Sequence, residues 1–381
     1  MRVYLRRPTT VFLAALLGGL LLPTVAFADD NGSWVGQRIM IIKPGVRIGH
    51  SDDFGRQIYV AELTDLVYTV LREEDTWLSV RHRGVEGWFD REQAVLLDDA
   101  LSYFAERVRA NNKDAFAFAH RGRAWQEEGE PERALRDLNE AIRLDPDTAA
   151  WFSARGRVYE ELEEHDRAIR DYSEALRLDP KDTLTFHNRG LAYKAVKEYK
   201  LAIADYSDAL RLDPKWATAY YNRANAYKAQ KDHDKAVADY SAALRLDPKR
   251  SDAYFNRAAA YRAQRDYDRA AGDYREVIRL DPEDADAYNN LAWLLATCPD
   301  GKVRDGKRAV EYAAKACELT SWKGPYYLAT LAAAYGETGN FEEALRWQKK
   351  ALDSAQYEKD EGGFARGRLK LFEDRKPYRE E

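Results

Sequence analysis

The four letters RLDP occur five times in this chain of 381 residues, each copy standing 34 residues after the one before it. The copies lie at residues 143–146, 177–180, 211–214, 245–248 and 279–282. A constant interval of this length indicates that one supersecondary unit is repeated along the chain. Proline cannot continue a helix, and it disfavours helical backbone in the aspartate that precedes it. Each RLDP therefore predicts the end of a helix.

Small and aromatic residues also recur at constant places within each repeat. In the third repeat the small residues are Gly190 and Ala202, whereas Phe186, Tyr193 and Tyr206 are the large ones. Small residues let two antiparallel helices approach closely, and aromatic rings fill the space beside the contact. One such hairpin cannot bury its apolar face alone, so neighbouring hairpins are expected to stack.

This pattern resembles the tetratricopeptide repeat, a helical hairpin of about 34 residues. The resemblance covers residues 100–375 and implies an all-α solenoid wound as a right-handed superhelix. We expect about seven repeats between two capping helices, because solenoids need atypical terminal units to stay soluble. The expected segments are a half-repeat at 100–112, repeats at 113–146, 147–180, 181–214, 215–248, 249–282, 283–325 (with an insert) and 326–359, and a final helix at 360–376.

Arginine and aspartate recur together in the five regular repeats. The pairs are Arg121 with Asp137, Arg155 with Asp171, Arg189 with Asp205, Arg223 with Asp239, and Arg257 with Asp273. In the two degenerate repeats both members change together, to Leu291 with Tyr312 and to Leu331 with Trp347. Pairing within each repeat satisfies all five arginines, whereas pairing between repeats would leave one charge unmatched at each end. We therefore predict structural ion pairs inside each hairpin.

Residues 34–98 have a different character, with short β-rich runs and turn residues. The order TWLSV, GVEGWF, AVLL resembles bacterial Src-homology-3-like domains, small all-β barrels attached to exported proteins. The resemblance implies a multidomain chain with a β-barrel before the solenoid, and in that family such domains are linked to cell-wall or peptide binding. Trp77 and Trp88 either line a ligand surface or fill the barrel core, and Trp77, on a predicted strand, is the better candidate for the core.

The first 28 residues are interpreted as a secretory signal peptide. They combine Arg6 and Arg7 with an apolar run at 11–22, too short to span a bilayer, and small residues at 26–28. The two arginines leave the twin-arginine route open beside the general secretory route. We expect an exported protein, periplasmic or associated with the cell envelope, with no stable membrane span after cleavage.

Charge and reactive residues exclude several function classes. The 65 acidic residues outnumber the 60 basic ones, which disfavours nucleic acid as a partner. The six histidines are scattered without the spacing of metal ligands, so we expect no metal, no cofactor and no catalytic site. Cys298 and Cys317 lie at positions of one hairpin that are on the order of 15 Å apart, and we predict two unpaired thiols.

Candidate binding residues lie on the first helix of each hairpin, where four successive repeats carry asparagine at one position: Asn188, Asn222, Asn256 and Asn290. In tetratricopeptide solenoids this position faces the concave surface, and the row resembles peptide-gripping arrays. Amides both donate and accept, so they either hold the backbone of an extended peptide or bond neighbouring backbone of their own chain. Six positions further on, the residues change from Gln126 and Glu160 to Lys194, Lys228 and Arg262, so the groove is expected to run from acidic to basic.

These observations predict a non-enzymatic adaptor or scaffold that works outside the cytoplasm. It would grip an extended peptide or a partner protein in the concave groove of the repeats. The alternative is a cell-wall binding protein that contacts peptidoglycan through the β-barrel, with the solenoid serving as a spacer or assembly module.

Overall fold

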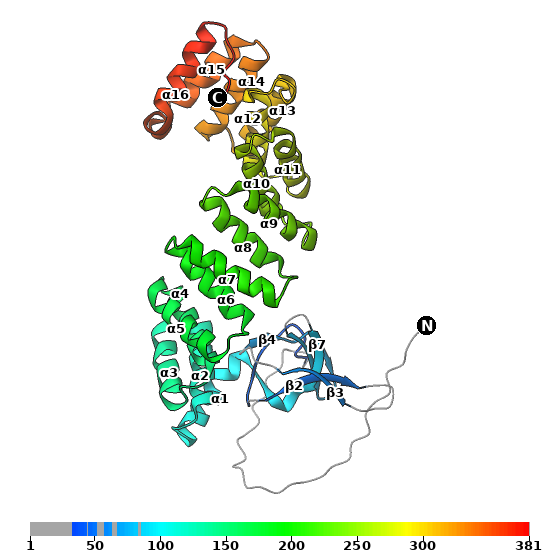
Figure 1. Ribbon diagram of the computed structural model, residues 1–381, viewed down its shortest axis with the longest axis vertical. Coiled ribbons are helices and arrows are strands. Elements are labelled where there is room, and N and C mark those ends of the chain that lie inside the picture. The colour runs from blue at the N-terminus through cyan, green and yellow to red at the C-terminus, as the bar shows by residue number, and fades with distance from the viewer. Residues whose placement is uncertain (1–32, 44, 52–56, 63–66, 83–84, 381) are drawn as a thin grey trace, which may run out of the picture. The chain divides into compact units, whose positions relative to one another are not determined.

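The computed structural model describes residues 33–43, 45–51, 57–62, 67–82 and 85–380 (Figure 1). Contacts between residues divide the chain into a first compact unit, Met1–Thr185, and a second, Phe186–Glu381. The predicted signal peptide at 1–28 lies outside the described residues. No helix among the described residues is both long enough and apolar enough to cross a membrane.

The first compact unit begins with a small domain of two antiparallel sheets. Its strands are β1 (Arg38–Ile41), β2 (Arg47–Ser51), β3 (Gln57–Glu62), β4 (Val67–Thr69), β5 (Arg72–Glu74), β6 (Trp77–His82), β7 (Val85–Asp90) and β8 (Ala94–Leu96), with a 3-10 turn η1 (Arg91–Gln93) before the last. One sheet has the order β4-β1-β8 and the other β3-β2-β7-β6-β5. The prediction of a small β domain ahead of the helices is confirmed.

Alternation along the strands builds the core of this domain. Leu78 and Val80 of β6 point inward opposite Phe89 and Gly87 of β7, and all four are buried. Gly87 is required there because a Cβ atom on it would lie 2.9 Å from the Cβ of Ile48. The glycine thus leaves room for the Ile48 side chain of β2, the strand next to β7 in the sheet.

The β domain shares a core with the first helices. Strand β8 leads directly into α1 (Leu97–Ala110), where the half-repeat was expected. Met40 and Val95 from the strands pack in one buried cluster with Ala100 and Phe104 of α1. Arg107 of this helix also donates a hydrogen bond to the carbonyl of Ile42. The strands therefore cover the end of the helical array rather than standing apart from it.

Fourteen helices in hairpin pairs follow among the described residues, and a longer helix ends the array. The first helices are α2 (Ala115–Glu127), α4 (Ala149–Glu161), α6 (Thr183–Ala195), α8 (Ala217–Ala229), α10 (Ser251–Ala263), α12 (Ala285–Thr297) and α14 (Pro325–Glu337). The second helices are α3 (Pro131–Leu144), α5 (His165–Leu178), α7 (Tyr199–Leu212), α9 (His233–Leu246), α11 (Tyr267–Leu280), α13 (Gly306–Leu319) and α15 (Phe341–Leu352). The prediction of helical hairpins is confirmed, and Figure 1 shows pairs such as α8 and α9 side by side.

RLDP ends five of the second helices as predicted. Helix α7 ends at Leu212, and Asp213 has the extended backbone that the following proline favours, with φ −129° and ψ 90°. Its carboxylate then accepts a hydrogen bond from the amide of Lys215 at 3.0 Å. The motif therefore stops one helix and starts the turn to the next hairpin.

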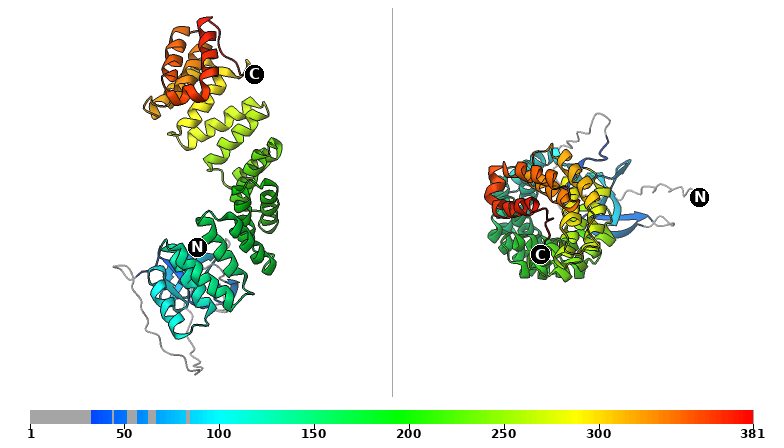
Figure 2. Two further views of the ribbon diagram at one scale, coloured as in Figure 1. Left: turned by 90° about the vertical axis from the view of Figure 1, so that its left-hand side faces the viewer. Right: turned by 90° about the horizontal axis from the view of Figure 1, so that it is seen from above.

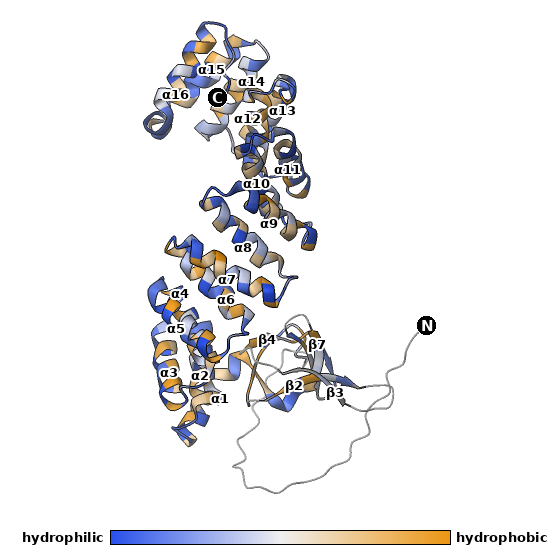
Figure 3. Ribbon diagram, viewed as in Figure 1, coloured by the Kyte–Doolittle hydropathy of each residue, from blue (hydrophilic) through white to orange (hydrophobic). Residues whose placement is uncertain are grey.

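Close approach of the paired helices explains the small residues. Gly190 of α6 faces the ring of Tyr206 in α7, and a Cβ atom on the glycine would lie 2.7 Å from that ring. Tyr206 is fully buried, and Ala202, one turn before it, is buried as well. Figure 3 shows hydrophobic and hydrophilic residues interleaved along these helices, as expected for hairpins that bury only part of each surface.

The array ends with α16 (Ala355–Glu373), which begins earlier than the capping helix expected at 360–376. Ser354 starts the helix by accepting a hydrogen bond from the amide of Tyr357. Figure 2 shows α14, α15 and α16, orange to red, packed on one another. Helix α16 is therefore part of the packed array.

The five arginine–aspartate pairs lie inside their hairpins. Each arginine donates from Nε and Nη2 to both carboxylate oxygens of its aspartate, at 2.6 to 2.8 Å. The pairs are Arg121–Asp137, Arg155–Asp171, Arg189–Asp205, Arg223–Asp239 and Arg257–Asp273. Each guanidinium also lies 5.4 to 5.9 Å from the ring of the aromatic residue three positions earlier.

In three of these arginines, Arg155, Arg223 and Arg257, a third donor contacts the preceding hairpin, which the sequence did not suggest. Nη1 of Arg223 donates to the hydroxyl of Ser207 at 2.9 Å, and Nη1 of Arg257 donates to Ser241 at the same distance. In the first compact unit Arg155 donates to the amide oxygen of Asn139 at 2.7 Å. Each of these arginine side chains therefore connects the two helices of its own hairpin and also bonds the preceding hairpin.

Replacing one member of a pair should cost more than replacing both. In Arg189→Leu the carboxylate of Asp205, whose side chain is 5% exposed, loses its partner, and we expect a loss of about 3 kcal/mol in unfolding free energy. Arg189→Leu/Asp205→Tyr copies the Leu291–Tyr312 combination and should lose about 1 kcal/mol. Urea denaturation measures both.

The matched control is Arg211→Leu, which breaks an exposed pair with Asp208 and should change stability by about 0.5 kcal/mol or less. A double variant at least as unstable as Arg189→Leu alone would refute the coupling.

Candidate functional site

The row of asparagines on the first helices is partly committed to contacts within the chain. The amide of Asn222 donates to Nε2 of His187 at 2.9 Å, one hairpin earlier. The amide of Asn256 donates in the same way to the hydroxyl of Tyr221, at 3.1 Å, and to the carbonyl of Asp252, at 2.9 Å. Of these bonds, only that from Asn256 to Asp252 is of the kind that the second expectation named, an amide bonded to neighbouring backbone. The other two go to side chains of the preceding hairpin.

Asn290 differs because the residue that would be its partner cannot accept a hydrogen bond. The position that holds His187 and Tyr221 in earlier repeats holds Phe255 in the fifth. The amide of Asn290 donates only to its own helix, to the carbonyl of Asp286 at 2.8 Å, among the contacts of the described residues. Asn188, the first of the row, is half-buried on α6.

The predicted cations lie near the asparagine of the next repeat. Nζ of Lys228 donates to the amide oxygen of Asn256 at 2.5 Å, and burial lowers the pKa of this lysine. Burial also lowers the pKa of Lys194. Arg262 lies beside Asn290 in the lining of one cavity. Lys228 and Asn256 thus form one contact of cation and amide, whereas Arg262 and Asn290 line the same cavity. The expected acidic-to-basic run along the whole array stays a prediction.

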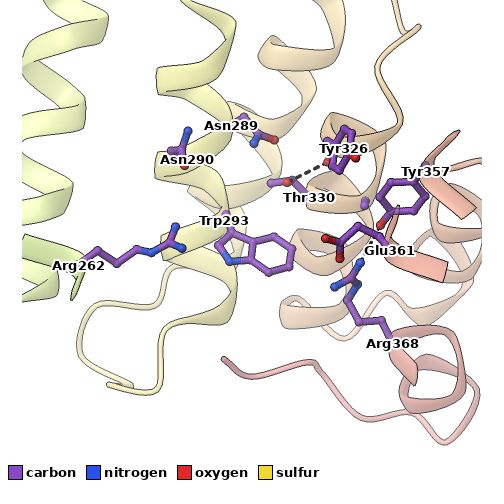
Figure 4. A pocket seen from close by; sticks show the side chains of 10 residues that line it. Arg262, Asn289, Asn290, Trp293, Tyr326, Thr330, Tyr357, Glu361 and Arg368 are labelled. Atoms are coloured by element: carbon purple, nitrogen blue, oxygen red, sulfur yellow. Dashed lines mark hydrogen bonds between the residues drawn. The ribbon is translucent and has the colours of Figure 1, made fainter. Parts of the chain in front are cut away.

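The cavity beside Asn290 has a volume of about 230 Å³ and lies between α10, α12, α14 and α16. Figure 4 shows Trp293 at its centre, with Arg262 on one side and Arg368 on the other. The remaining lining residues are Asn289, Asn290, Tyr326, Ala329, Thr330, Tyr357 and Glu361. The cavity thus combines an aromatic face, two amides, two guanidinium groups and one carboxylate, that of Glu361. Its cations outnumber its anions, which suits a peptide segment with an acidic side chain.

Arg368 is the most unusual group in this cavity. It is 6% exposed, and its Nη2 donates to the hydroxyl of Tyr357 at 2.7 Å. Its Nε is buried without a hydrogen-bond partner, and no carboxylate of the described residues forms an ion pair with it. The side-chain oxygen of Asn289 is likewise buried and unpartnered. Because buried charges are normally paired, an anionic group is the natural complement of this arginine.

The sequence analysis missed Trp293 and Arg368. Trp293 stands where the two preceding repeats carry Asn225 and Ala259, and this departure from the repeat was the available signal. Arg368 lies in the capping helix, outside the repeat, so no periodicity marks it.

The β domain has a second cavity, of about 430 Å³, which both predicted tryptophans line. Trp77 and Trp88 lie on the same face of the β6–β7 pair, since Ser79, two residues after Trp77, is the partner of Trp88 in the register. Trp77 is half-buried there, so its assignment to the core was wrong, since alternation with the inward Leu78 and Val80 turns it to the other face. Trp34, 4% exposed, is the core tryptophan.

The other reactive residues are buried inside the packing. Cys298 and Cys317 are free, as predicted, and both are buried. Burial raises the pKa of Cys317 to about 12. No group of three or more potential metal ligands occurs in the part of the chain that the structure describes. Burial lowers the pKa of His187 to about 4, with Lys194 acting in the same direction, and lowers that of His120 to about 3.

These histidines should make stability depend on pH. Unfolded imidazoles bind a proton near pH 6.5, whereas His187 in the fold stays neutral down to about pH 4. The unfolded state therefore binds more protons at this residue between these values, so the contribution of His187 to stability falls as pH drops through 6.5 and levels off near 4. His187→Phe, which copies Phe255, should remove on the order of 3 kcal/mol of this decline. Denaturation across this pH range measures it, and an unchanged slope in the variant would exclude His187 as a source.

Comparisons with known proteins agree with this fold. Family profiles described as tetratricopeptide repeat match residues 120–183, 217–250, 251–284, 273–307 and 326–356, and one described as TPR repeat matches 195–231. Together they span more than half of the chain. No curated protein matches it.

Solved structures are similar to this chain at low sequence identity. The C-terminal part of a TPR repeat-containing protein from Cytophaga hutchinsonii is 18% identical, with 62% of this chain and 94% of that one covered and a TM-score of 0.53. YrrB, a TPR protein described as having an unusual peptide-binding site, is 22% identical, with coverage of 49% and 96% and a TM-score of 0.46. PilF of Pseudomonas aeruginosa is 20% identical, with coverage of 57% and 97% and a TM-score of 0.46. The chain belongs to the tetratricopeptide-repeat family.

Proposed function

We propose that this protein is an adaptor that binds an extended peptide, or an extended segment of a partner protein, along the inner side of the first helices in the second compact unit. Tetratricopeptide repeats support a protein-interaction adaptor in general, and none of the matching family profiles is that of an enzyme. The observation that carries the proposal is the cavity in which Asn289, Asn290 and Trp293 of α12 meet two arginines.

Each group in this cavity has a use in peptide binding. Asn290 has an amide oxygen to offer to a backbone N–H, and the unpartnered oxygen of Asn289 is a second acceptor. The ring of Trp293 provides apolar area, while Arg262 and Arg368 suit a carboxylate. Backbone contacts would give affinity with little sequence dependence, and the ring and charges would add selectivity.

Loss of the two α12 amides should weaken partner binding. We expect Asn289→Ala/Asn290→Ala to retain about tenfold less of the partner that co-purifies with the unchanged chain from cell envelopes, because backbone contacts are lost. Quantitative mass spectrometry of the captured proteins measures this. Asn222→Ala and Asn256→Ala are poorer probes because these amides bond neighbouring hairpins.

The control is Arg211→Ala/Arg279→Ala, on side chains that are 68% and 62% exposed near the ends of α7 and α11. It should capture the partner as well as the unchanged chain does. Equal capture by both double variants would place the partner elsewhere and reject the inner surface as its site.

We propose further that the chain is exported and works in the periplasm or cell envelope. The support is the sequence of residues 1–28, with its basic start, apolar run and small residues before the proposed cleavage after Ala28. N-terminal sequencing of protein recovered from the native cell should therefore begin at Asp29. An intact N-terminus in cytoplasmic protein would contradict export.

A second candidate function rests on the cavity of the β domain, whose likeness to Src-homology-3-like barrels remains part of this proposal. Trp77, Trp88 and Tyr59, the last 61% exposed, lie there with Lys43 and Arg47. Aromatic faces and cations suit a peptide or the peptide-bearing sugar polymer of a cell wall. Retention on insoluble wall that Trp77→Ala/Trp88→Ala abolishes in the full chain would favour this alternative over the adaptor.

A further inference from the structure

The chain that follows α16 turns back onto the array. Helix α16 ends at Glu373, Arg375 has left-handed backbone with φ +55°, and the amide of Lys376 donates to the carbonyl of Leu371 at 2.8 Å. Pro377 then prevents further helix. Residues 377–380, here called the returning segment, are consequently half-buried, and Figure 1 shows the end of the chain beside α12 and α14.

The returning segment contacts the surface that lines the cavity. The ring of Tyr378 lies 5.7 Å from that of Trp293. The amide of Glu380 donates to the carbonyl of Thr297 at 2.9 Å, and its carboxylate lies 3.5 Å from the guanidinium of Arg262. Trp293 and Thr297 are one turn apart on α12, so the segment follows one side of that helix as an extended peptide would.

Arg368 completes this arrangement from α16. Its guanidinium lies 5.6 Å from the ring of Trp293 and 5.6 Å from that of Tyr378, between the array and the segment. The buried cation has no ion-pair partner among the described residues, so the segment supplies an aromatic face but no carboxylate to it. The site is therefore only partly satisfied by the chain's own residues.

The acidic contact of the segment is loose. The separation of 3.5 Å from Arg262 and that of 3.4 Å between the Trp293 indole nitrogen and the Glu380 carboxylate are at the long limit for polar contacts. The side chains of Arg262 and Glu380 are 37% and 30% exposed, and pairs of this kind add little stability. Arg379 is held more firmly, since it pairs with Glu337, which also accepts a hydrogen bond from Arg304 at 3.1 Å.

From these contacts we infer that the surface formed by Arg262, Trp293 and Arg368 is a binding site for a peptide in which an aromatic residue is followed two positions later by a carboxylate. Tyr378 and Glu380 occupy this site within the same chain. A partner segment of the same chemistry binds by displacing them, and its carboxylate gains Arg368 as well as Arg262. The inference rests on the proposed function and specifies the ligand of that surface.

Release of the returning segment should open the site to a peptide added in solution. The probe is a fluorescent peptide with the sequence of residues 374–380, acetylated and amidated to remove terminal charges. Because a tethered segment competes at an effective concentration in the millimolar range, the full chain carrying Tyr378→Ser/Glu380→Ser should bind the probe about tenfold or more tightly than the unchanged chain. Fluorescence anisotropy gives both dissociation constants.

Three controls make the measurement specific. Lys376→Ala, an exposed residue just before the segment, should leave probe affinity as in the unchanged chain. A probe with serine in place of its tyrosine and its final glutamate should not bind. Adding Arg262→Ala to the released variant should return affinity to the level of the unchanged chain or below.

Equal probe binding by released and unchanged chains, or binding that survives Arg262→Ala, would overturn the inference. If the released variant does not fold, the test moves to the unchanged chain, where excess probe should speed hydrogen exchange of the Glu380 amide by several-fold, and no change would refute displacement. Self-association of the unchanged chain that the probe breaks would show that a second copy donates the segment, and would reject occupation within one chain.

Failure here is distinguishable from failure of the proposed function. If the probe does not bind but partner capture still depends on Asn289 and Asn290, only the identity of the ligand is wrong. If the probe binds and capture is unaffected by those amides, the site exists but the proposed partner contact does not.

Discussion

Two helices can pack at short range only where one of them offers a small side chain to the other, and this condition governs each hairpin. Gly190 accepts the ring of Tyr206, and alanine replaces glycine at this position in the fourth and fifth repeats, at Ala224 and Ala258. At that separation the side chains of Arg189 and Asp205 meet with both donors and both oxygens matched. In the sixth repeat Leu291 and Tyr312 belong to one apolar cluster, so an apolar pair can replace the charged one. The contacts between the two helices of each hairpin thus stabilise the fold. The residues on the inner side of the first helices can therefore vary from one repeat to the next.

That freedom explains why the inner side is uneven. Where His187 or Tyr221 accepts from the next asparagine, the amide nitrogen links two neighbouring hairpins. Where Phe255 interrupts this exchange, Asn290 donates only to its own helix among the contacts of the described residues, and it lines a cavity with Trp293 and Arg368. The candidate binding residues therefore lie together at the repeat where the asparagine no longer bonds the side chain of the preceding hairpin. A regular array would bury its polar groups in its own contacts and offer a partner little to bind.

The sequence predicted most of what is periodic and little of what is not. The helix ends at RLDP, the hairpins and the contact between arginine and aspartate all follow from residues that return every 34 positions. Arg368 belongs to no repeat, and its meeting with Trp293 depends on how α16 packs, so no spacing could have shown it. The misplacement of Trp77 has another origin. The run TWLSV alternates, and its two inward residues, Leu78 and Val80, turn the tryptophan to the opposite face.

The common core of the β domain and α1 has a consequence for how this protein can be divided. Met40 and Val95 pack against Ala100 and Phe104 in one core. Cutting the chain between the strands and the helices would therefore expose apolar surface of both parts to solvent. The strands cover the apolar end of the helical array. A grafted or shortened version of the repeats would need a new polar cover at that end, and an exchange of the β domain between proteins would have to carry α1 with it.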